Sequence, residues 1–244
     1  MNVICIIQAR IGSSRLPEKV LKKIEGKTVL EHDVDRLKRV ESINEIVIAT
    51  TVEESDSKIV DEANRLNVKY FRGSGEDVLS RYYFAAKENK ADIVVRVTSD
   101  CPLIDSQVTD EIIKFYIDNY PIYDYVSNTL DRTYPRGLDT EVFSFEALEK
   151  AFNEAKENFQ REHVTPFIWD NNKEFSNYQF KDSRDNSHLR LTLDTAEDLE
   201  LITEVYSELY SLDNKFGLKE LINLFEKRPE LIYINNEIEQ KKIK

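Results

Sequence analysis

The sequence lacks the features that mark secreted and membrane-spanning proteins. Its 244 residues include only two cysteines, Cys5 and Cys101, which form no disulfide framework and no Cys-x-x-Cys metal pattern. The apolar run from Val3 to Ile7 is too short for a signal peptide, and no cleavage site follows it. No window approaches the roughly 20 apolar residues that a membrane span requires. We therefore expect a protein of the reducing cytoplasm that does not enter a membrane.

An excess of positive charge is also absent. The chain has 34 Lys and Arg residues against 46 Asp and Glu residues, a net charge of -12. Proteins that bind nucleic acids neutralise phosphates with cationic side chains, so this balance argues against a nucleic-acid partner. It does not exclude a small anionic ligand held in a locally positive pocket.

The composition that is present is typical of a soluble globular protein. Hydrophobic residues make up 41% of the chain and charged residues 33%. A chain of 244 residues can bury most of its surface without a disulfide. Because no internal repeat, low-complexity stretch or Ser/Gly linker interrupts it, we expect a single domain over residues 1–244.

Strand and helix patterns alternate over the first half of the chain. Apolar, β-rich runs alternate with segments of helical spacing in the order 3–9, 28–40, 45–51, 56–67, 68–73, 76–89, 91–100 and 106–119. Thr28 is a candidate N-cap. This alternation predicts an α/β fold with a parallel sheet and helices on both faces. Ligands bind such sheets at the carboxyl ends of the strands.

The pattern is weaker in the second half. Residues 121–143 are expected to be extended around a Pro/Gly turn, as a hairpin or a substrate arm. Further segments are predicted as a helix at 146–158, a helix at 161–172, a strand at 188–194 and a helix at 195–209 capped by Thr195.

The loop after the first strand, in IIQARIGSSRLPEKVL, is rich in groups that bind phosphate. A phosphate site needs backbone N–H groups and cations directed into a concavity. The loop offers one glycine, two serines and three cations, namely Gly12, Ser13, Ser14, Arg10, Arg15 and Lys19. It is neither a Walker loop nor a dinucleotide fingerprint. A phosphate site and an ordinary solvated loop both remain open interpretations.

Aspartates follow two predicted strands. Asp100 and Asp105 lie in RVTSDCPLID, and Asp194 ends LRLTLD. A carboxylate after a buried strand commonly anchors Mg²⁺, which usually takes one or two carboxylates plus substrate phosphates. The alternative is a turn former or helix cap, which suits Asp105 well. Two such aspartates with a cationic loop on the same rim favour metal-assisted phosphoryl or nucleotidyl transfer.

The remaining charged residues have two interpretations. Those in FRGSGEDVLSRYY could line the same rim or cap a helix, and those in YPRGLDTEVF could face a polar substrate. His163 and His188 are isolated, and an isolated histidine is more often structural than catalytic. Three scattered histidines form no metal set. A serine hydrolase would need a G-x-S-x-G elbow, which the sequence lacks.

Six motifs together resemble a known family. IIQARIGSSRLPEKVL, FRGSGEDVLSRYY, RVTSDCPLID, YPRGLDTEVFSFEALE, REHVTPFI and LRLTLDTAEDLELI occur in this order, to about Leu209. They are similar to the cytidylyltransferase family, in particular the branch called spore coat polysaccharide biosynthesis protein F. Its relatives make CMP-activated acylneuraminate and 3-deoxy-manno-octulosonate. The resemblance implies a three-layer α/β/α sandwich with a mainly parallel, Rossmann-like sheet, as in nucleotide-diphospho-sugar transferases.

The resemblance also implies a reaction and its residues. A sugar or sugar-acid hydroxyl would attack the α-phosphorus of CTP, and pyrophosphate would leave, with Mg²⁺ as the cofactor. The implied nucleotide-binding residues are Gln8, Ala9, Arg10, Gly12, Ser13, Ser14, Arg15, Lys19, Arg72 and Asp77. The implied acceptor-binding residues are Arg81, Arg136, Asp139 and Glu141. Asp100 and Asp194 would hold the metal, and the catalytic residues would be Arg15, Lys19 and Asp100.

The acceptor is not defined by the motifs. Ser99 stands where many members have glycine, and Gln8 stands where the acylneuraminate synthetases have proline. The family often forms homodimers, so residues 121–143 are a candidate arm for either a substrate or a second subunit. Two other classes remain open: a nucleotide-sugar glycosyltransferase on the related fold, and a non-catalytic nucleotide or sugar sensor.

Overall fold

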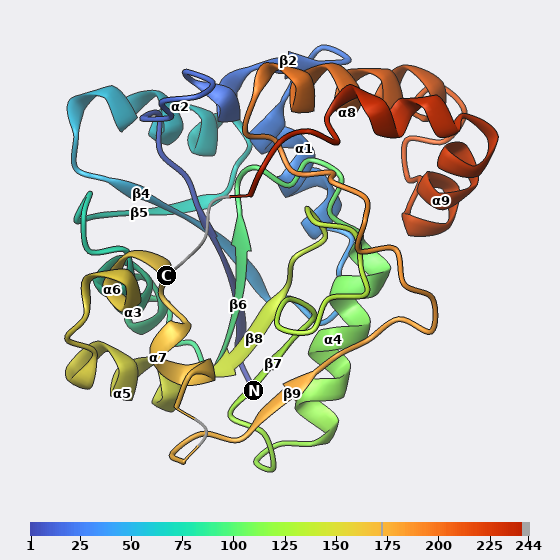
Figure 1. The fold of residues 1–244 in the computed structure, drawn as a ribbon. Coiled ribbons are helices and arrows are strands. Elements are labelled where there is room, and N and C mark those ends of the chain that lie inside the picture. The colour runs from blue at the N-terminus through green and yellow to red at the C-terminus, as the bar shows by residue number, and fades with distance from the viewer. Residues whose placement is uncertain (172, 241–244) are drawn as a thin grey trace.

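One seven-stranded sheet forms the centre of the protein (Figure 1). The computed structural model describes residues 1–171 and 173–240. The sheet has the order β5-β4-β1-β6-β8-β7-β9. Its strands are β1 (Val3–Gln8), β4 (Glu45–Thr51), β5 (Lys69–Gly73), β6 (Ile93–Thr98), β7 (Tyr125–Ser127), β8 (Glu141–Ser144) and β9 (Asn177–Gln179). A small antiparallel pair, β2 (Lys23–Ile24) and β3 (Lys27–Thr28), lies outside it.

The strands β5, β4, β1 and β6 are all parallel, whereas β8 runs antiparallel to both β6 and β7. Parallel strands covered on both faces are apolar along their whole length. In β1, Cys5 and Ile7 face one helical layer while Ile4 and Ile6 face the other. The predicted α/β class and its mainly parallel sheet are confirmed.

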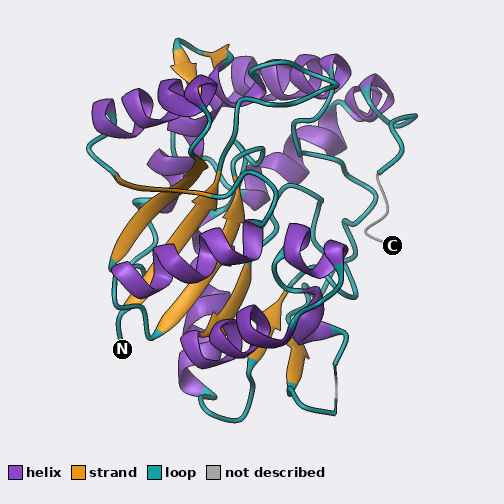
Figure 2. Cartoon of the chain, turned by 90° about the vertical axis from the view of Figure 1, so that its left-hand side faces the viewer, coloured by secondary structure: helices purple, strands orange, loops and turns teal. Residues whose placement is uncertain are grey.

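Helices cover both faces of the sheet (Figure 2). One layer contains α1 (Val29–Leu37), α2 (Ser57–Arg65) and α4 (Ser106–Asp118). The other contains α3 (Val78–Glu88), α5 (Phe145–Glu154), α6 (Asn158–His163) and α7 (Pro166–Trp169). A third apolar cluster joins α8 (Ala196–Leu209), α9 (Leu218–Lys227) and the 3-10 helix η3 (Pro229–Ile234). Short 3-10 helices occur at η1 (Lys19–Leu21) and η2 (Glu54–Asp56). Among the described residues, no helix has the length and apolar character needed to cross a bilayer.

The predicted helix caps are present. The Thr28 hydroxyl accepts a hydrogen bond from the backbone N–H of Glu31 at 3.0 Å, and Thr195 caps α8 in a capping box. Asp105 caps α4 by accepting from the Val108 N–H at 2.8 Å, as its alternative interpretation predicted. These contacts define where the helices beside the sheet begin.

Two predicted elements are wrong. Residues 188–194 form no strand, because their backbone pairs with two separate segments: Leu191 N–H donates to Arg136 and Leu193 N–H donates to Asp100. Only an isolated bridge links Arg136 and Arg190. The helix predicted over 161–172 is interrupted after His163, because Val164 leaves the helical conformation with φ 73°, and a new short helix begins at Pro166. Position 172 lies outside the described residues.

The segment 121–143 contributes to the central sheet. It contains β7 and leads into β8, which pair antiparallel from Tyr125↔Phe143 to Ser127↔Glu141. The connection between these strands runs along the cleft described below, where Arg132, Arg136 and Asp139 line its wall.

A buried carboxyl group lies in the layer formed by α1. Asp33 is 0% exposed, and neither of its carboxyl oxygens has a hydrogen-bond partner among the described residues. Burial raises the pKa of Asp33 well above its usual value, and the charge of Asp100 adds to this effect, while Arg36 and Lys19 oppose it. Asp33 is therefore neutral in the folded protein at a pH where it ionises in the unfolded chain.

Replacing Asp33 with leucine should stabilise the protein. Asp33→Leu removes an unsatisfied buried polar group, so we expect a gain of about 1–3 kcal/mol in urea unfolding at pH 7. Because the folded-state pKa is raised, wild-type stability falls as pH rises from the usual Asp range toward that pKa. The gain should therefore grow with pH. Asp33→Asn is the control: it removes the titration but keeps a buried polar group. A less stable leucine variant would show that the carboxyl group has a partner.

Candidate active site

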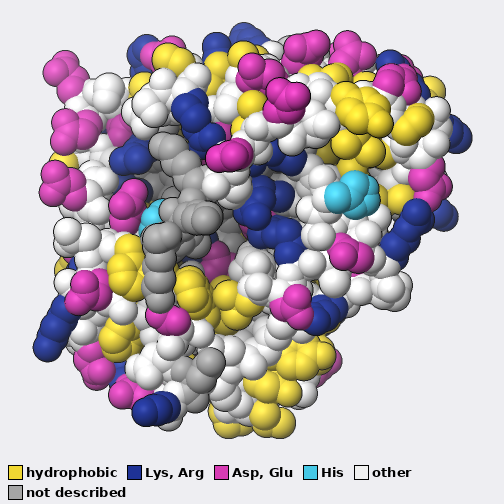
Figure 3. All heavy atoms as spheres, viewed as in Figure 1, with side chains coloured by type: hydrophobic (Ala, Val, Ile, Leu, Met, Phe, Trp, Pro, Cys, Tyr) yellow, Lys and Arg dark blue, Asp and Glu magenta, His cyan; other side chains and the backbone are white. Residues whose placement is uncertain are grey.

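A cleft of about 1690 Å³, called the main cleft below, opens at the carboxyl ends of β1 and β6. Its walls come from the loop after β1, residues 98–101, the β7–β8 connection, α6, α7 and residues 192–194. Figure 3 shows cationic side chains gathered in this hollow. The predicted location of the site, at the carboxyl ends of parallel strands, agrees with this cleft.

The loop after β1 is held in place by β4 and the turn that follows it. The Ala9 N–H donates to the Ala49 carbonyl at 3.1 Å, and the Ile11 N–H donates to Asp56 Oδ1 at 2.7 Å. Asp56 is 2% exposed, so it fixes the loop from inside the protein. Gln8 and Ala9 line the main cleft at the base of this loop.

Several donors of this loop have no partner in the part of the chain that the structure describes. Within the described part of the chain, nothing accepts from the backbone N–H groups of Gly12 and Ser14, or from the Arg10 guanidinium. A Cβ at Gly12 would meet no atom within 4 Å. Ser13 and Ser14 also line the main cleft. The loop thus presents free N–H donors and a free cation to the cleft, which is the arrangement that binds phosphate.

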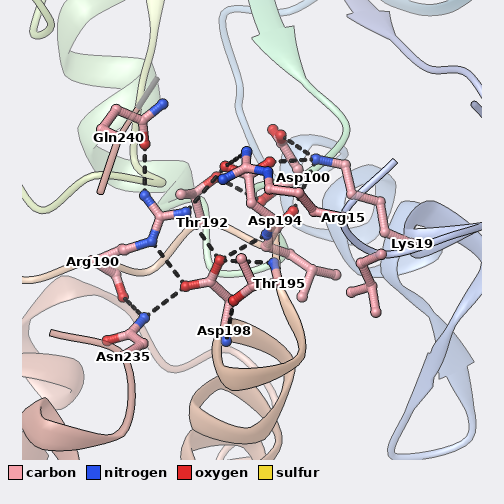
Figure 4. A network of polar contacts seen from close by, with 12 residues as sticks. Arg15, Lys19, Asp100, Arg190, Thr192, Asp194, Thr195, Asp198, Asn235 and Gln240 are labelled. Atoms are coloured by element: carbon pink, nitrogen blue, oxygen red, sulfur yellow. Dashed lines mark hydrogen bonds and ion pairs between the residues drawn. The ribbon is translucent and has the colours of Figure 1, made fainter. Parts of the chain in front are cut away.

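Lys19 brings the two predicted metal aspartates together (Figure 4). Its Nζ donates to Asp100 Oδ2 at 2.7 Å, to Asp194 Oδ1 at 2.8 Å and to the Leu193 carbonyl at 2.9 Å. Burial alone would lower the pKa of Lys19, but the two carboxylates outweigh it and raise the pKa above its usual value. Lys19 therefore remains cationic between them.

Asp194 accepts from two further cations. Arg15 Nη2 and Arg190 Nη2 each lie 3.0 Å from Asp194 Oδ2. Burial would raise the pKa of Asp194, yet Lys19 and Arg15 hold it below its usual value. The carboxylate is therefore ionised at neutral pH. The prediction that Asp194 ends a strand is wrong, but its side chain does reach the cleft.

Asp100 is fixed through both its backbone and its side chain. The Thr98 hydroxyl donates to Asp100 Oδ1 at 2.6 Å. The Asp100 carbonyl accepts from the Leu193 N–H at 2.8 Å and from the Thr192 hydroxyl at 3.2 Å. These bonds join the end of β6 to the segment before α8, so the two carboxylates keep their relative position.

The two carboxylates suit a divalent cation. Both lie within 2.8 Å of one cationic nitrogen, so a single cation can satisfy them. Among the described residues, no group of three or more His, Cys, Asp or Glu could hold a metal alone. Mg²⁺ usually takes one or two carboxylates and fills its remaining positions with water and substrate phosphates. Asp100 and Asp194 therefore fit Mg²⁺ brought together with a nucleotide.

The opposite wall contains the predicted acceptor residues. Asp139 is paired with Arg132, whereas the Arg136 guanidinium has no acceptor among the described residues. Burial lowers the pKa of Arg136, and Arg132 and Arg190 lower it further. Gly137 has φ +104°, and a Cβ there would lie 2.5 Å from the backbone of Leu191. Glycine thus allows the close approach that places Arg136 in the cleft.

Glu141 lines the main cleft, but its oxygens are already used. Arg96 Nη1 pairs with Oε1 of Glu141. The hydroxyls of Tyr125 and Thr165 both donate to Oε2, at 2.7 Å and 2.5 Å respectively. Glu141 is 6% exposed. Its carboxylate therefore holds the wall of the cleft together in the described structure.

The motif around residues 72–81 is only partly in the cleft. Arg72 is not among the lining residues, because its guanidinium donates to the Thr51 and Glu53 carbonyls at 2.8 Å each. Asp77 and Arg81 do line the cleft. Asp77 caps α3 and pairs with Arg161, whereas Arg81 is buried and donates to the Ser74 carbonyl.

Sequence reasoning missed two residues that orient the acidic pair. Asp198 is 0% exposed and accepts from Arg190 Nε at 2.8 Å and from the Asp194 N–H at 2.9 Å. Asp198 stands three residues after the Thr195 cap, and Arg190 stands four before Asp194. These spacings were available signals. His163, which belongs to the REHVTPFI motif, and Trp169 also line the cleft, although no role there was predicted for either.

Comparison with known proteins identifies the family. The family model for cytidylyltransferases matches residues 4–238. The chain belongs to the cytidylyltransferase family. It is 30% identical over 237 residues to the spore coat polysaccharide biosynthesis protein SpsF of Bacillus subtilis, covering 94% of this chain and 96% of that protein. It is 35% identical to a solved cytidylyltransferase of Leptospira borgpetersenii, with a TM-score of 0.92 over 99% of this chain and 100% of that one.

A more distant structure shares the fold of this cytidylyltransferase-family chain. CMP:2-keto-3-deoxy-manno-octonic acid synthetase, solved in complex with CTP, has a TM-score of 0.68 at 17% identity. The match covers 85% of this chain and 99% of that chain. The expected Rossmann-like nucleotidyltransferase fold is confirmed, as is the resemblance inferred from the motifs.

The buried pair Arg190–Asp198 should be essential for stability. Arg190→Met leaves the Asp198 carboxylate buried without its cation, so we expect a loss of about 3–5 kcal/mol in urea unfolding. Arg15→Met is the matched control, since the Arg15 side chain is 31% exposed and Asp194 keeps two other cations. It should cost no more than about 1 kcal/mol. Equal losses for the two variants would contradict this ranking.

Proposed function

We propose that this protein transfers CMP from CTP to a hydroxyl of a sugar, most simply a sugar acid, with release of pyrophosphate. The observation that carries the proposal is the contact of Lys19 with Asp100 and Asp194 beside a loop with free N–H donors. Family membership supports the class of reaction. The B. subtilis relative is named for the biosynthesis of spore coat polysaccharide, which is a surface polysaccharide. This name supports a role for the product in surface polysaccharide synthesis.

In this proposal the loop after β1 binds the triphosphate. A bound CTP carries close to four negative charges, which the free Arg10 guanidinium and the N–H groups of Gly12 and Ser14 would stabilise. Arg15 and Lys19 would balance the charge that builds on the departing pyrophosphate. Such positioning and electrostatic stabilisation supply much of the rate of phosphoryl-type transfers.

Asp100 and Asp194 would hold Mg²⁺. When bound, this ion neutralises phosphate charge and makes the α-phosphorus more electrophilic. The aspartates keep the position needed for this because Thr98, Thr192 and Arg190 fix them. In the described structure Lys19 satisfies both carboxylates, and Mg²⁺ would take over this role when it binds.

Arg136 would bind the acid group of the acceptor. It lines the same cleft, and its guanidinium has no acceptor among the described residues. A guanidinium recognises a carboxylate through two parallel hydrogen bonds. An uncharged sugar would leave this cation uncompensated, so the free guanidinium supports a sugar acid.

The reaction is tested by its products. CTP, Mg²⁺ and a panel of 2-keto sugar acids should release pyrophosphate and form a CMP-sugar. A glycosyltransferase would instead release a nucleoside diphosphate from a nucleotide sugar. A sensor would bind CTP without any turnover.

Substitution of Lys19 should impair both binding and turnover. Lys19→Ala removes a charge-assisted contact worth about 1.5–3 kcal/mol. We expect kcat/KM for CTP to fall about 10- to 150-fold, with a higher KM and a lower kcat, in a pyrophosphate-release assay. Lys114→Ala on α4, outside the cleft, is the control and should keep wild-type kinetics. Unchanged kinetics in the Lys19 variant would remove the loop from the mechanism.

Asp100→Asn should abolish Mg²⁺-dependent pyrophosphate release while leaving the fold intact. The amide keeps the shape of the side chain but loses the charge that holds a cation. Circular dichroism and the melting temperature would report the fold, and Asp110→Asn on α4 would serve as the control. An Asp100→Asn variant that retains Mg²⁺-dependent turnover would exclude Asp100 as a metal ligand.

A further inference from the structure

His163 lies in the wall of the main cleft. It is the last residue of α6 and lines the cleft together with Thr165. Within residues 1–171 and 173–240, no group forms a hydrogen bond or an ion pair with its imidazole ring. A structural histidine normally has such a partner. The His32 ring, for example, forms a hydrogen bond with the Ile24 carbonyl at 2.8 Å. The expectation that His163 is structural therefore has no supporting contact.

The backbone beside His163 adopts a costly conformation. Val164 has φ 73° and ψ −60°, which a β-branched residue rarely adopts. The Thr165 N–H donates to the His163 carbonyl at 2.9 Å and closes this tight turn. Val164 is 0% exposed in the cluster formed with α3 and α5, so packing holds it there. Such strain persists at functional sites, and here it directs His163 toward the cleft.

The acidic residues of the cleft are poor candidates for accepting a proton. Glu141 is bound by Arg96, Tyr125 and Thr165. Asp77, Asp139, Asp100 and Asp194 are each paired with a cation. The two remaining acids, Glu76 and Glu162, are exposed to solvent. Among the described residues that line the cleft, His163 is the half-buried group whose ring nitrogens are free to accept a proton.

We propose that His163 is the general base that takes the proton from the attacking hydroxyl of the acceptor, an inference that rests on the proposed function. The acceptor oxygen forms a bond to the α-phosphorus of CTP while its proton passes to the free imidazole nitrogen. The bond from the α-phosphorus to the bridging oxygen breaks, and its electron pair leaves with pyrophosphate. The imidazolium then returns the proton to solvent, so no further reactant is required.

The charges around His163 agree with this role. Burial lowers its pKa below the usual value. Glu162 on the same helix raises the pKa, Arg96 on β6 lowers it, and Glu141 on β8 raises it, without reversing the effect of burial. The imidazole is therefore neutral, and able to accept a proton, at neutral pH.

Kinetics of His163→Gln test the proposal. Glutamine keeps hydrogen-bonding capacity but cannot accept the proton. With CTP, Mg²⁺ and the acceptor that turns over, kcat should fall about 100- to 10,000-fold while the KM for CTP stays within about threefold. The acid limb of the wild-type kcat profile should disappear in the variant. In His163→Ala, added imidazole should restore part of the rate.

His188→Gln is the matched control, because His188 is exposed and lies outside the main cleft. It should keep the wild-type rate and pH profile. A His163→Gln variant within threefold of wild-type kcat, or one that is slow but keeps the acid limb, would overturn the proposal.

A second measurement separates this inference from the proposed function. Proton NMR titration of the histidine rings, assigned with the two glutamine variants, needs no turnover. The pKa of His163 should lie below the usual histidine value because of burial, and its resonance should shift when CTP, Mg²⁺ and the 2-keto sugar acids are added, whereas that of His188 should not shift. If wild type releases no pyrophosphate with any sugar, the proposed function fails. A His163 resonance that none of these additions moves overturns the inference about His163 itself.

Discussion

The contact of one ammonium group with two carboxylates determines the geometry of the site. Asp100 follows a strand of the sheet, and Asp194 precedes a helix of the third apolar cluster. Two carboxylates that both lie within 2.8 Å of one nitrogen atom are close enough to repel each other unless a cation lies between them. Lys19 supplies that cation and ties the loop after β1 to both. Three parts of the chain that are distant in sequence therefore meet at a single nitrogen atom.

Cationic side chains slightly outnumber acidic ones among the described residues of the cleft, whereas acidic residues are in excess in the whole chain. Of the residues that the structure describes, eight Lys and Arg and seven Asp and Glu line it, against 34 and 46 in the full sequence. Arg132, Arg161 and Arg96 are neutralised by carboxylates of the walls. Among the described residues, Arg10, Arg81 and Arg136 have no carboxylate partner, and of these Arg81 donates to the Ser74 carbonyl. The uncompensated positive charge thus lies where a triphosphate and an acid group would each need it.

Much of the fold could be predicted because its signals are local. Alternating apolar runs and helical spacing located β1, β4 and β6, and the Thr28 and Thr195 caps followed from side-chain chemistry. The failures depend on contacts that are distant in sequence. Residues 188–194 look like a strand, but their backbone bonds go to two different segments. Arg72 looks like a cleft residue, yet backbone carbonyls of the neighbouring strand end bind its guanidinium.

The residues of the site come from distant parts of the sequence, so they are synthesised at different times. Domains form as the chain leaves the ribosome from its N-terminus. Lys19 and Asp100 emerge early, whereas Asp194, Asp198 and their partner Arg190 belong to the last quarter of the sequence. Asn235, still later, donates to Asp198 at 2.8 Å. A chain that ends before these residues therefore carries the loop after β1 without Asp194, and the two halves of the site meet only once residues 190–235 have been made.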